Sequence, residues 1–336
     1  MGRLSLSAAI EKVRLAKPFR ISGYVFEDSD LLVVTLREGG HEGRGEASGV
    51  YYLGDDAPHM LAEVERVRAS IEAGVSREEL RALLPPGGAR NAIDCALWEL
   101  EAKRSGSPVW KLAGLPSTKS LVTTFTLSAD DPDVMAQGAR DYVQARSLKL
   151  KLTGEAELDS ARVRAVRQAR PDAWMGVDAN QGYTIDELDR LVAALVDCDV
   201  KLLEQPLARG READLQGYRS PIPIAADESA LSLVDIPGLV GRFDVVNIKL
   251  DKCGGLTEGL MMAAEARRLG LDVMVGNMIA TSLAMAPAFV LGQHCDIVDL
   301  DGPIFLAADR VPGVVYNDGL VWCGDEVWGS ADAIAA

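Results

Sequence analysis

The sequence predicts an α/β protein, a (β/α)7β-type TIM barrel with an α+β capping domain built from the N-terminal region and the C-terminal tail. Three observations predict this fold. Strand-like and helix-like segments alternate from about residue 121, the first 115 residues lack that alternation, and polar residues follow the apolar strands at a regular spacing. The length of 336 residues suits one barrel and a smaller second domain.

The N-terminal region is predicted to be an α+β domain because its strands and helices are not interleaved. Residues 31–36 form a short apolar β segment. The clearest helix starts at Asn91, where apolar side chains recur with helical spacing at Ile93, Ala96, Leu97 and Leu100. We assign residues 1–115 to the capping domain, residues 116–305 to the barrel, and residues from about 306 to 336 to a return of the chain to the capping domain.

Eight barrel strands are expected, each starting 20 to 27 residues after the one before. This spacing is typical of one strand and one helix in a parallel α/β fold. An open doubly wound sheet is the alternative, but such a sheet normally shows a glycine-rich phosphate turn after its first strand, and residues 127–130 do not form one. The strands are expected to start near Val122, Leu148, Met175, Leu202, Ile222, Val245, Asp272 and Ile297.

Composition excludes several classes of function. Fifty acidic and 35 basic residues give a net charge of −15, which repels nucleic acid and anionic membranes. No apolar stretch reaches the length of about 18 residues that a membrane helix needs, and the N-terminus lacks the apolar stretch of a signal peptide. We therefore expect a cytoplasmic protein that contacts neither nucleic acid nor membrane.

Cysteine and histidine usage narrows the chemistry. The five cysteines are scattered without a CxxC pair, so we expect reduced core thiols and no zinc site. Only three histidines occur, and no GxSxG motif is present, which argues against serine or cysteine nucleophiles. We interpret His294 and the Met261-Met262 pair as core residues. Catalysis is expected to depend on carboxylates and lysines.

Three consecutive predicted strands each end in a carboxylate: Asp178, Glu204 and Asp227. The carboxyl ends of barrel strands meet at one rim, so these groups should converge there. Three converging carboxylates repel each other unless a cation lies between them, and all-oxygen ligation indicates Mg²⁺, with Mn²⁺ as a substitute. The alternative is that each residue merely caps the following helix.

Lysines supply the second half of the predicted site. In the second strand, the period of two places Lys149 and Lys151 on one face and leucines on the other, so both lysines should point into the barrel. Two neighbouring ammonium groups should lower each other's pKa, which suits a general base. Lys249, at the end of the sixth strand, lies across the barrel from Lys151 and could flank a substrate with it. The alternative is a surface strand with solvated lysines.

This arrangement predicts a reaction. A substrate carboxylate on Mg²⁺ has an acidified α-proton, because the metal stabilises the enediolate that forms when the proton leaves. One lysine takes the proton from one face. The other lysine either returns a proton to the opposite face, giving epimerisation, or assists the departure of a β-substituent, giving elimination.

The ordered set of motifs resembles the muconate-lactonising-enzyme subgroup of the enolase superfamily, in which a Lys or His base acts with Mg²⁺. Gly45-Glu46 and residues 90–94 are similar to the capping domain of that subgroup. The motifs are Lys149-Leu150-Lys151, Asp178-Ala179-Asn180, Glu204-Gln205-Pro206, Asp227-Glu228-Ser229, and Asn247-Ile248-Lys249-Leu250 followed by Gly254-Gly255.

Within that subgroup, the sequence Asp299-Leu300-Asp301-Gly302-Pro303 resembles dipeptide epimerases. Residues 246–258 are similar to those of proteobacterial L-Ala-D/L-Glu epimerases. The resemblance implies a dipeptide substrate whose α-ammonium group is held by Asp299 and Asp301, with inversion at the α-carbon of the C-terminal residue. The period of two places both carboxylates on one face at the barrel mouth. The alternative is a pair of solvated rim acids.

Residues 23–30 correspond to the mobile capping loop of this family, in which glutamate-specific members place an arginine. No arginine occurs there, although Arg20 lies just before it. We expect Tyr24 and Phe26, together with Thr126, to contact the substrate and to favour an apolar, aromatic or basic C-terminal residue over glutamate.

Competing functions remain open at this point. The first alternative is β-elimination or cycloisomerisation on the same site, as in o-succinylbenzoate synthases and muconate cycloisomerases, whose substrates carry no ammonium group. A Schiff-base aldolase would use one buried lysine and no carboxylate triad, and a non-catalytic barrel would not need every catalytic position filled. The expected partner is a small-molecule dipeptide. A homo-oligomer is possible, and the sequence fixes neither its size nor the pathway.

Overall fold

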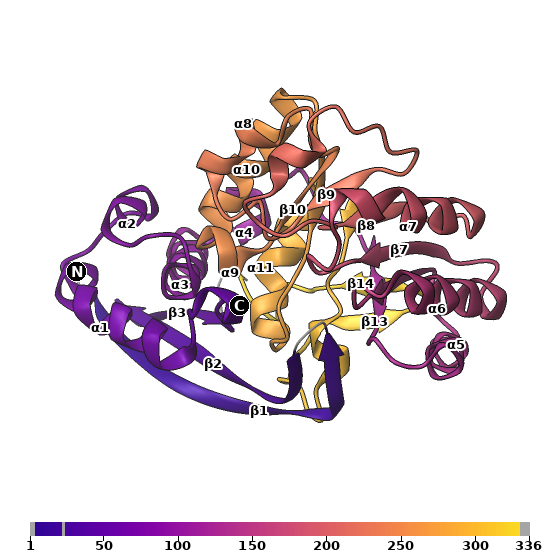
Figure 1. The fold of residues 1–336 in the computed structure, drawn as a ribbon. Helices are drawn as coiled ribbons and strands as arrows, with labels where there is room; N and C mark the ends of the chain where they lie inside the picture. Colours follow the sequence, from indigo (N-terminus) through magenta and orange to yellow (C-terminus); the bar gives the residue numbers. More distant parts are fainter. Residues whose placement is uncertain (1–3, 22–23, 330–336) are drawn as a thin grey trace.

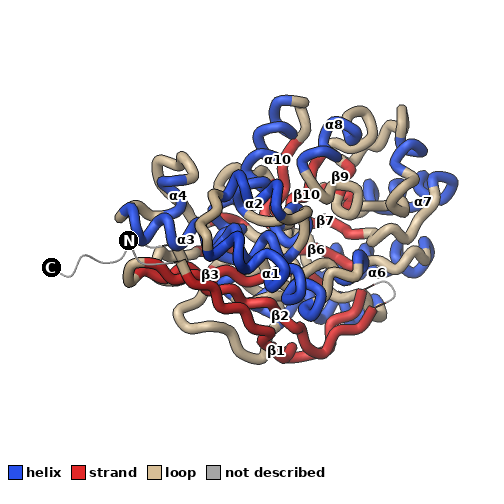
Figure 2. The backbone as a smooth tube through the Cα atoms, turned by 90° about the vertical axis from the view of Figure 1, so that its left-hand side faces the viewer, coloured by secondary structure: helices blue, strands red, loops and turns tan. Residues whose placement is uncertain are grey.

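The computed structural model describes residues 4–21 and 24–329, so Gly23 of the expected loop and the last residues of the tail lie outside the described part. The N-terminal lobe has an antiparallel sheet in the order β1-β2-β3, and three helices lie along one side of it (Figures 1 and 2). Its main elements are β1 (Ser5–Ile21), β2 (Tyr24–Glu38), β3 (His41–Ala47), α1 (Ala57–Glu72), α2 (Arg77–Leu83) and α3 (Gly88–Ser105).

Packing of the sheet on α3 explains why this lobe folds. Leu32, Val34 and Leu36 alternate along β2, and all three side chains are fully buried. Strand β3 lies so close to α3 that a Cβ added at Gly45 would come within 2.0 Å of the carbonyl oxygen of Ala92. Glycine is therefore required where the strand crosses the helix.

The second lobe is an eight-stranded parallel barrel whose strands follow one another in chain order. The first and last strands are joined through side chains: the backbone N–H of Leu300 donates to Thr123 Oγ1, and that of Thr126 donates to Asp301 Oδ2. The strands are β5 (Thr124–Leu127), β6 (Ser147–Lys151), β7 (Trp174–Asp178), β8 (Leu202–Glu204), β9 (Ile224–Ala226), β10 (Val245–Ile248), β11 (Asp272–Val275) and β12 (Ile297–Val298).

Helices cover the outside of the barrel (Figure 1). Leu148 and Leu150 of β6 are fully buried within the main hydrophobic core, while the lysines between and after them face the barrel interior. The covering helices are α5 (Pro132–Asp141), α6 (Ala156–Ala169), α7 (Ile185–Asp197), α8 (Ile236–Leu239), α10 (Leu256–Arg268) and α11 (Ser282–Gly292).

Buried polar contacts join the two lobes. Arg90 of α3 donates to Glu258 of α10 at 2.8 Å, and Asp94 accepts the backbone N–H of Thr257 at 2.9 Å. A Cβ at Gly255 would lie 2.5 Å from the Asp94 side chain, so the glycine leaves room for this contact. The lobes therefore meet through fixed hydrogen bonds beside the barrel mouth.

The tail contacts both lobes. Strands β13 (Val315–Asn317) and β14 (Leu320–Trp322) form a small sheet with β4 (Leu121–Val122), next to the start of the barrel. Further on, the indole N–H of Trp328 donates to the carbonyl oxygen of Arg44 in β3.

The predicted fold class is confirmed, and each barrel strand starts within two residues of the position expected. One expected loop is wrong, because residues 24–30 belong to β2, paired with the end of β1. The core assignment fails for His294 and for Met261, which are both exposed, whereas Met262 is buried. All five cysteines are free thiols, and four of them are buried. Among the described residues, no helix has the length and apolarity needed to cross a membrane.

Candidate active site

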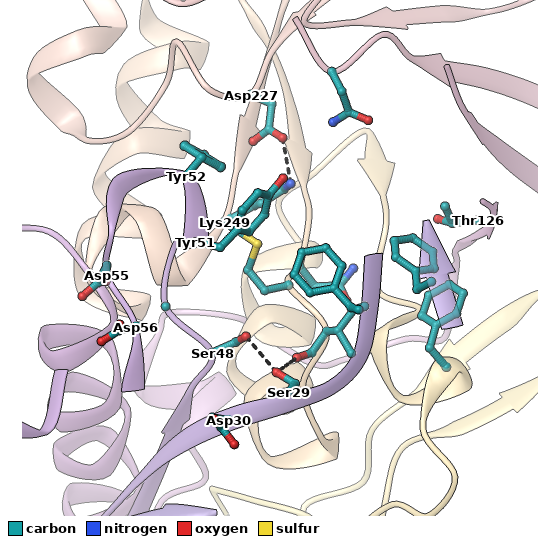
Figure 3. A pocket seen from close by; sticks show the side chains of 18 of the residues that line it. Ser29, Asp30, Ser48, Tyr51, Tyr52, Asp55, Asp56, Thr126, Asp227 and Lys249 are labelled. Atoms are coloured by element: carbon teal, nitrogen blue, oxygen red, sulfur yellow. Dashed lines mark hydrogen bonds and ion pairs between the residues drawn. The ribbon is translucent and has the colours of Figure 1, made fainter. Parts of the chain in front are cut away.

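A cavity of about 420 Å³ lies between the carboxyl ends of the barrel strands and the N-terminal lobe (Figure 3). The barrel contributes every predicted lysine and both acids of the eighth strand. The N-terminal lobe contributes the end of β1, the first part of β2, and the segment that contains η1 (Tyr51–Leu53). The cavity thus has a charged floor, and its cover combines aromatic rings with acids: Phe19, Phe26, Tyr51 and Tyr52 with Asp28, Asp30, Asp55 and Asp56.

The three predicted carboxylates converge beneath the cavity, and Asp227 is the one of the three that lines it. Asp178 ends β7, Glu204 ends β8 and Asp227 follows β9, and one oxygen from each lies within 4.8 Å of the others. All three are buried. Burial and the neighbouring Asp178 raise the pKa of Glu204 to about 7. Ionising all three carboxylates without a nearby cation is therefore unfavourable.

Lysines surround these carboxylates. Lys151 Nζ lies 2.6 Å from Asp178 Oδ2, and Lys249 Nζ lies 2.8 Å from Asp227 Oδ2. Lys149 Nζ lies 2.7 Å from Glu204 Oε2. Because Lys151 and Lys249 come from the second and sixth strands, they approach the floor from opposite sides of the barrel.

The expected lowering of the lysine pKa values is wrong for Lys149. Burial alone would lower its pKa, but the carboxylates of Asp299, Glu204 and Asp178 outweigh burial and raise the pKa well above its usual range. The pKa of Lys249 is likewise raised, with Asp227 opposing the effect of burial. Two neighbouring ammonium groups alone would lower each other's pKa, but the fold surrounds them with carboxylates, which have the opposite effect.

The charge of the floor leaves room for a divalent cation. Six carboxyl groups and four lysines are buried there, which leaves a formal excess of two negative charges. Burial, followed by the neighbouring carboxylates, raises the pKa of Glu204 to about 7 and that of Glu228 to about 8. Oxygen ligands with that charge fit Mg²⁺. The groups are Asp178, Glu204, Asp227, Glu228, Asp299 and Asp301, with Lys149, Lys151, Lys249 and Lys252.

The two acids of the eighth strand line the same cavity. Asp299 accepts from Lys149 Nζ at 2.8 Å and from the hydroxyl of Thr124. Asp301 Oδ2 accepts the backbone N–H of Thr126 at 2.7 Å, so Thr126 lies at this end of the cavity as well. Both acids are more than nine-tenths buried, which excludes the alternative of solvated rim acids.

The predicted capping residues lie on β2. Phe26 lines the cavity, whereas Tyr24 is 46% exposed and contacts the rings of Phe26 and Tyr51. Arg20 is exposed on β1, and its carbonyl oxygen accepts the N–H of Ala129. Arg20 does not line the cavity.

Sequence reasoning missed several residues of the site. Asn247 Nδ2 donates to Glu204 Oε1 at 2.8 Å, and Lys252 Nζ donates to Asp227 Oδ1 at 2.6 Å. The signal that the sequence offered was their position in the motif around Lys249, directly after the apolar start of the sixth strand. Tyr51 and Tyr52 gave no signal, because they belong to an irregular segment.

Comparisons with known proteins agree with this geometry. A family model described as Enolase C-terminal domain-like matches residues 134–322, and one described as Mandelate racemase / muconate lactonizing enzyme, N-terminal domain, matches residues 5–114. The L-Ala-D/L-Glu epimerase of Escherichia coli (strain K12) is 39% identical over 305 residues, covering 91% of this chain and 95% of that protein.

Two crystal structures are similar along almost the whole chain. An enolase family member from Agrobacterium tumefaciens with homology to dipeptide epimerases, with bound sodium and L-Ala-L-Glu, is 42% identical with a TM-score of 0.93 and covers 97% of this chain and 100% of its own. A dipeptide epimerase from Methylococcus capsulatus, complexed with Mg and L-Arg-D-Lys, is 31% identical with a TM-score of 0.90, covering 96% and 97%. This chain belongs to the mandelate racemase/muconate lactonizing enzyme group of the enolase superfamily.

Proposed function

We propose that this protein is a Mg²⁺-dependent dipeptide epimerase that inverts the α-carbon of the C-terminal residue by a 1,1-proton transfer. One observation carries the proposal: two lysines from opposite sides of the barrel meet a buried carboxylate triad, and an acid pair lies in the same cavity. A dipeptide has a carboxylate, which would bind at the cation held by the triad, and an α-ammonium group, which would bind to the acid pair.

Asp178, Glu204 and Asp227 would hold the cation, because they are the acidic residues whose ligand oxygens lie together. When bound, Mg²⁺ supplies positive charge beside the substrate carboxylate, which acidifies the neighbouring α-proton. Lys151 and Lys249 then act on opposite faces of the α-carbon. One removes the α-proton as a neutral amine and the other delivers a proton as an ammonium group, so the configuration inverts.

Asp299 and Asp301 would hold the α-ammonium group of the substrate. Burial, followed by the neighbouring Asp299, raises the pKa of Asp301 to about 6, and a bound ammonium would relieve that repulsion. N-acetylation of the substrate removes the positive charge and should weaken binding by about 2–5 kcal/mol.

Similarity to characterised proteins supports the same reaction. The E. coli relative is named as an epimerase, and the Methylococcus structure holds Mg and a dipeptide. Elimination or cycloisomerisation would use the lysines and the triad, but its substrates carry no ammonium group for the acid pair to bind. We propose an enzyme without nucleic-acid partners, because its net charge of −15 repels the phosphate groups of nucleic acids.

The test is exchange of the α-proton in D₂O, followed by proton NMR, for a set of L-Ala-L-Xaa dipeptides with and without chelator. Exchange and epimerisation should both require Mg²⁺ or Mn²⁺. Glu204→Gln should weaken Mg²⁺ binding, measured by calorimetry, by more than about tenfold because one anionic ligand is lost. Full activity in excess chelator, or a dehydrated product in place of an epimer, would overturn the proposal.

A further inference from the structure

Resting on the proposed function, we infer that the C-terminal residue of the dipeptide carries a large apolar or aromatic side chain, bound against an aromatic wall formed by Phe26, Tyr51 and Tyr52. The known relatives do not decide this point, because their ligands include both L-Ala-L-Glu and L-Arg-D-Lys. The residues that line the cavity of this chain therefore have to decide which side chain it accepts.

The cavity has two chemically different ends. Asp299, Asp301 and Thr126 lie at one end, where the ammonium group belongs. Tyr51 and Tyr52 lie at the other, beside Lys249 and Asp227 (Figure 3). The substrate carboxylate belongs near the triad, so the C-terminal residue lies at the tyrosine end. Its side chain has to point towards the N-terminal lobe, because buried charged groups fill the floor.

Rings form a continuous surface at that end. The ring centroids of Phe26 and Tyr51 are 5.3 Å apart, and those of Tyr51 and Tyr52 are 5.1 Å apart. The ring of Tyr24 packs against Tyr51, with 4.6 Å between the ring centroids. The three wall residues remain partly exposed in the cavity. Exposed aromatic surface lining a concave site is typical of a subsite for an apolar group.

Acidic residues near the wall already have partners. Lys12 Nζ lies 3.1 Å from both Asp28 and Asp30. Asp55 accepts the N–H of Gly88 at 2.7 Å, and Asp56 accepts an N–H at the start of α1. Each of these acids already has a partner, so a cationic side chain would have to compete with that partner, while the net negative charge of the four acids disfavours a glutamate side chain.

Glu228 is the remaining acid at this end. It lines the cavity and is 2% exposed, and its buried Oε2 has no hydrogen-bond partner among the described residues. The basic residues among the described lining are Lys149, Lys151 and Lys249, which the reaction uses. A carboxylate side chain thus finds no cation at the wall.

The experiment compares kcat/KM for L-Ala-L-Phe, L-Ala-L-Lys, L-Ala-L-Glu and L-Ala-L-Ala with the wild-type enzyme. We expect L-Ala-L-Phe to be about ten- to hundredfold better than L-Ala-L-Ala, from the burial of the ring, and to exceed both charged substrates. A preference for L-Ala-L-Glu or L-Ala-L-Lys would overturn the inference and leave the epimerase proposal intact. Absence of epimerisation with all four would remove both.

Variants locate the subsite. Phe26→Ala should lower the ratio of kcat/KM for L-Ala-L-Phe over L-Ala-L-Ala by about tenfold. Val25→Ala is the matched control, because Val25 is the adjacent strand residue, 58% exposed, and does not line the cavity. The Val25 variant should keep the wild-type ratio. An unchanged ratio in the Phe26 variant would show that the side chain binds elsewhere.

Discussion

The barrel floor and the aromatic wall differ in how their side chains are held. On the floor, each of the four lysines contacts at least one carboxylate within 2.8 Å, and the charged groups are nine-tenths or more buried. In the wall, rings contact rings and stay partly exposed. The floor can hold reacting groups in fixed positions, whereas the wall can change its residues without disturbing them. Chemistry and side-chain selection therefore belong to different lobes.

The largest effect should come from the floor. Lys151→Ala should lose α-proton exchange with one epimer of the substrate, and Lys249→Ala should lose exchange with the other. Epimerisation should fall by about 10²- to 10⁴-fold in both, since both proton transfers are needed. Exchange in D₂O measured separately for L,L and L,D dipeptides separates the two variants.

Lys201→Ala is the matched control, because Lys201 precedes β8 at the opposite end of the barrel and its side chain is 47% exposed. It should keep wild-type activity. If either single floor variant epimerises at near the wild-type rate, the two lysines do not flank the substrate.

The floor was predictable because its residues obey a simple rule. Lys149 and Lys151 share one strand face, and Asp178 and Glu204 end consecutive strands, so periodicity and repeat spacing were enough to bring them together. The pKa values of these residues could not be predicted from the sequence. The pKa of Lys149 depends on carboxylates more than 25 residues away along the chain, whose distances only the fold determines.

The wall was predicted only in part. The sequence predicts that Phe26 contacts the substrate, but it also predicts a loop where the structure has a strand. The partner of that strand is the far end of β1, where polar and apolar residues do not alternate cleanly. Tyr51 and Tyr52 belong to a short irregular segment with no period, so nothing local places them over the barrel.

A second prediction concerns Asp251, which joins the two regions. It follows β10, and its Oδ1 accepts the backbone N–H groups of Ser48 and Gly49, just before the tyrosines. Burial raises its pKa from 3.8 to about 7. The folded protein thus binds this proton more tightly than the unfolded chain, and stability from this group falls as pH rises from about 4 to 7, by up to about 4 kcal/mol.

Asp251→Asn should keep the two hydrogen bonds, because its carbonyl oxygen accepts in the same way, and should remove that pH dependence. Urea unfolding at pH 5 and pH 8 measures it: the variant should gain stability over the wild type at pH 8. Glu27→Gln, an exposed change on β2, is the control. Equal pH dependence in the variant and the wild type would show that ionising Asp251 in the folded protein does not lower the free energy of unfolding.

A third prediction concerns the support of the wall. Gly45→Ala places a Cβ 2.0 Å from the backbone oxygen of Ala92, which cannot move without shifting α3. We expect a loss of about 3 kcal/mol in the free energy of unfolding. Gly238→Ala is the control, because its Cβ would meet nothing within 4 Å. A variant as stable as the wild type would mean that β3 is free to move away from α3.

The smallest effect should come from the rim of the wall. Lys12 pairs with both Asp28 and Asp30, so Lys12→Met should leave these two carboxylates of the cavity lining without that partner. The kcat/KM for L-Ala-L-Lys relative to L-Ala-L-Phe should then rise about two- to fivefold at low salt, because exposed charges interact weakly. The gain should vanish at high ionic strength, where exposed charges are screened. Lys17→Met, an exposed change on the same strand, should leave the ratio unchanged. A rise in the ratio that does not depend on salt would place the new contact in a buried position. No rise would mean that Asp28 and Asp30 do not interact with the substrate side chain, so the aromatic rings alone would select it.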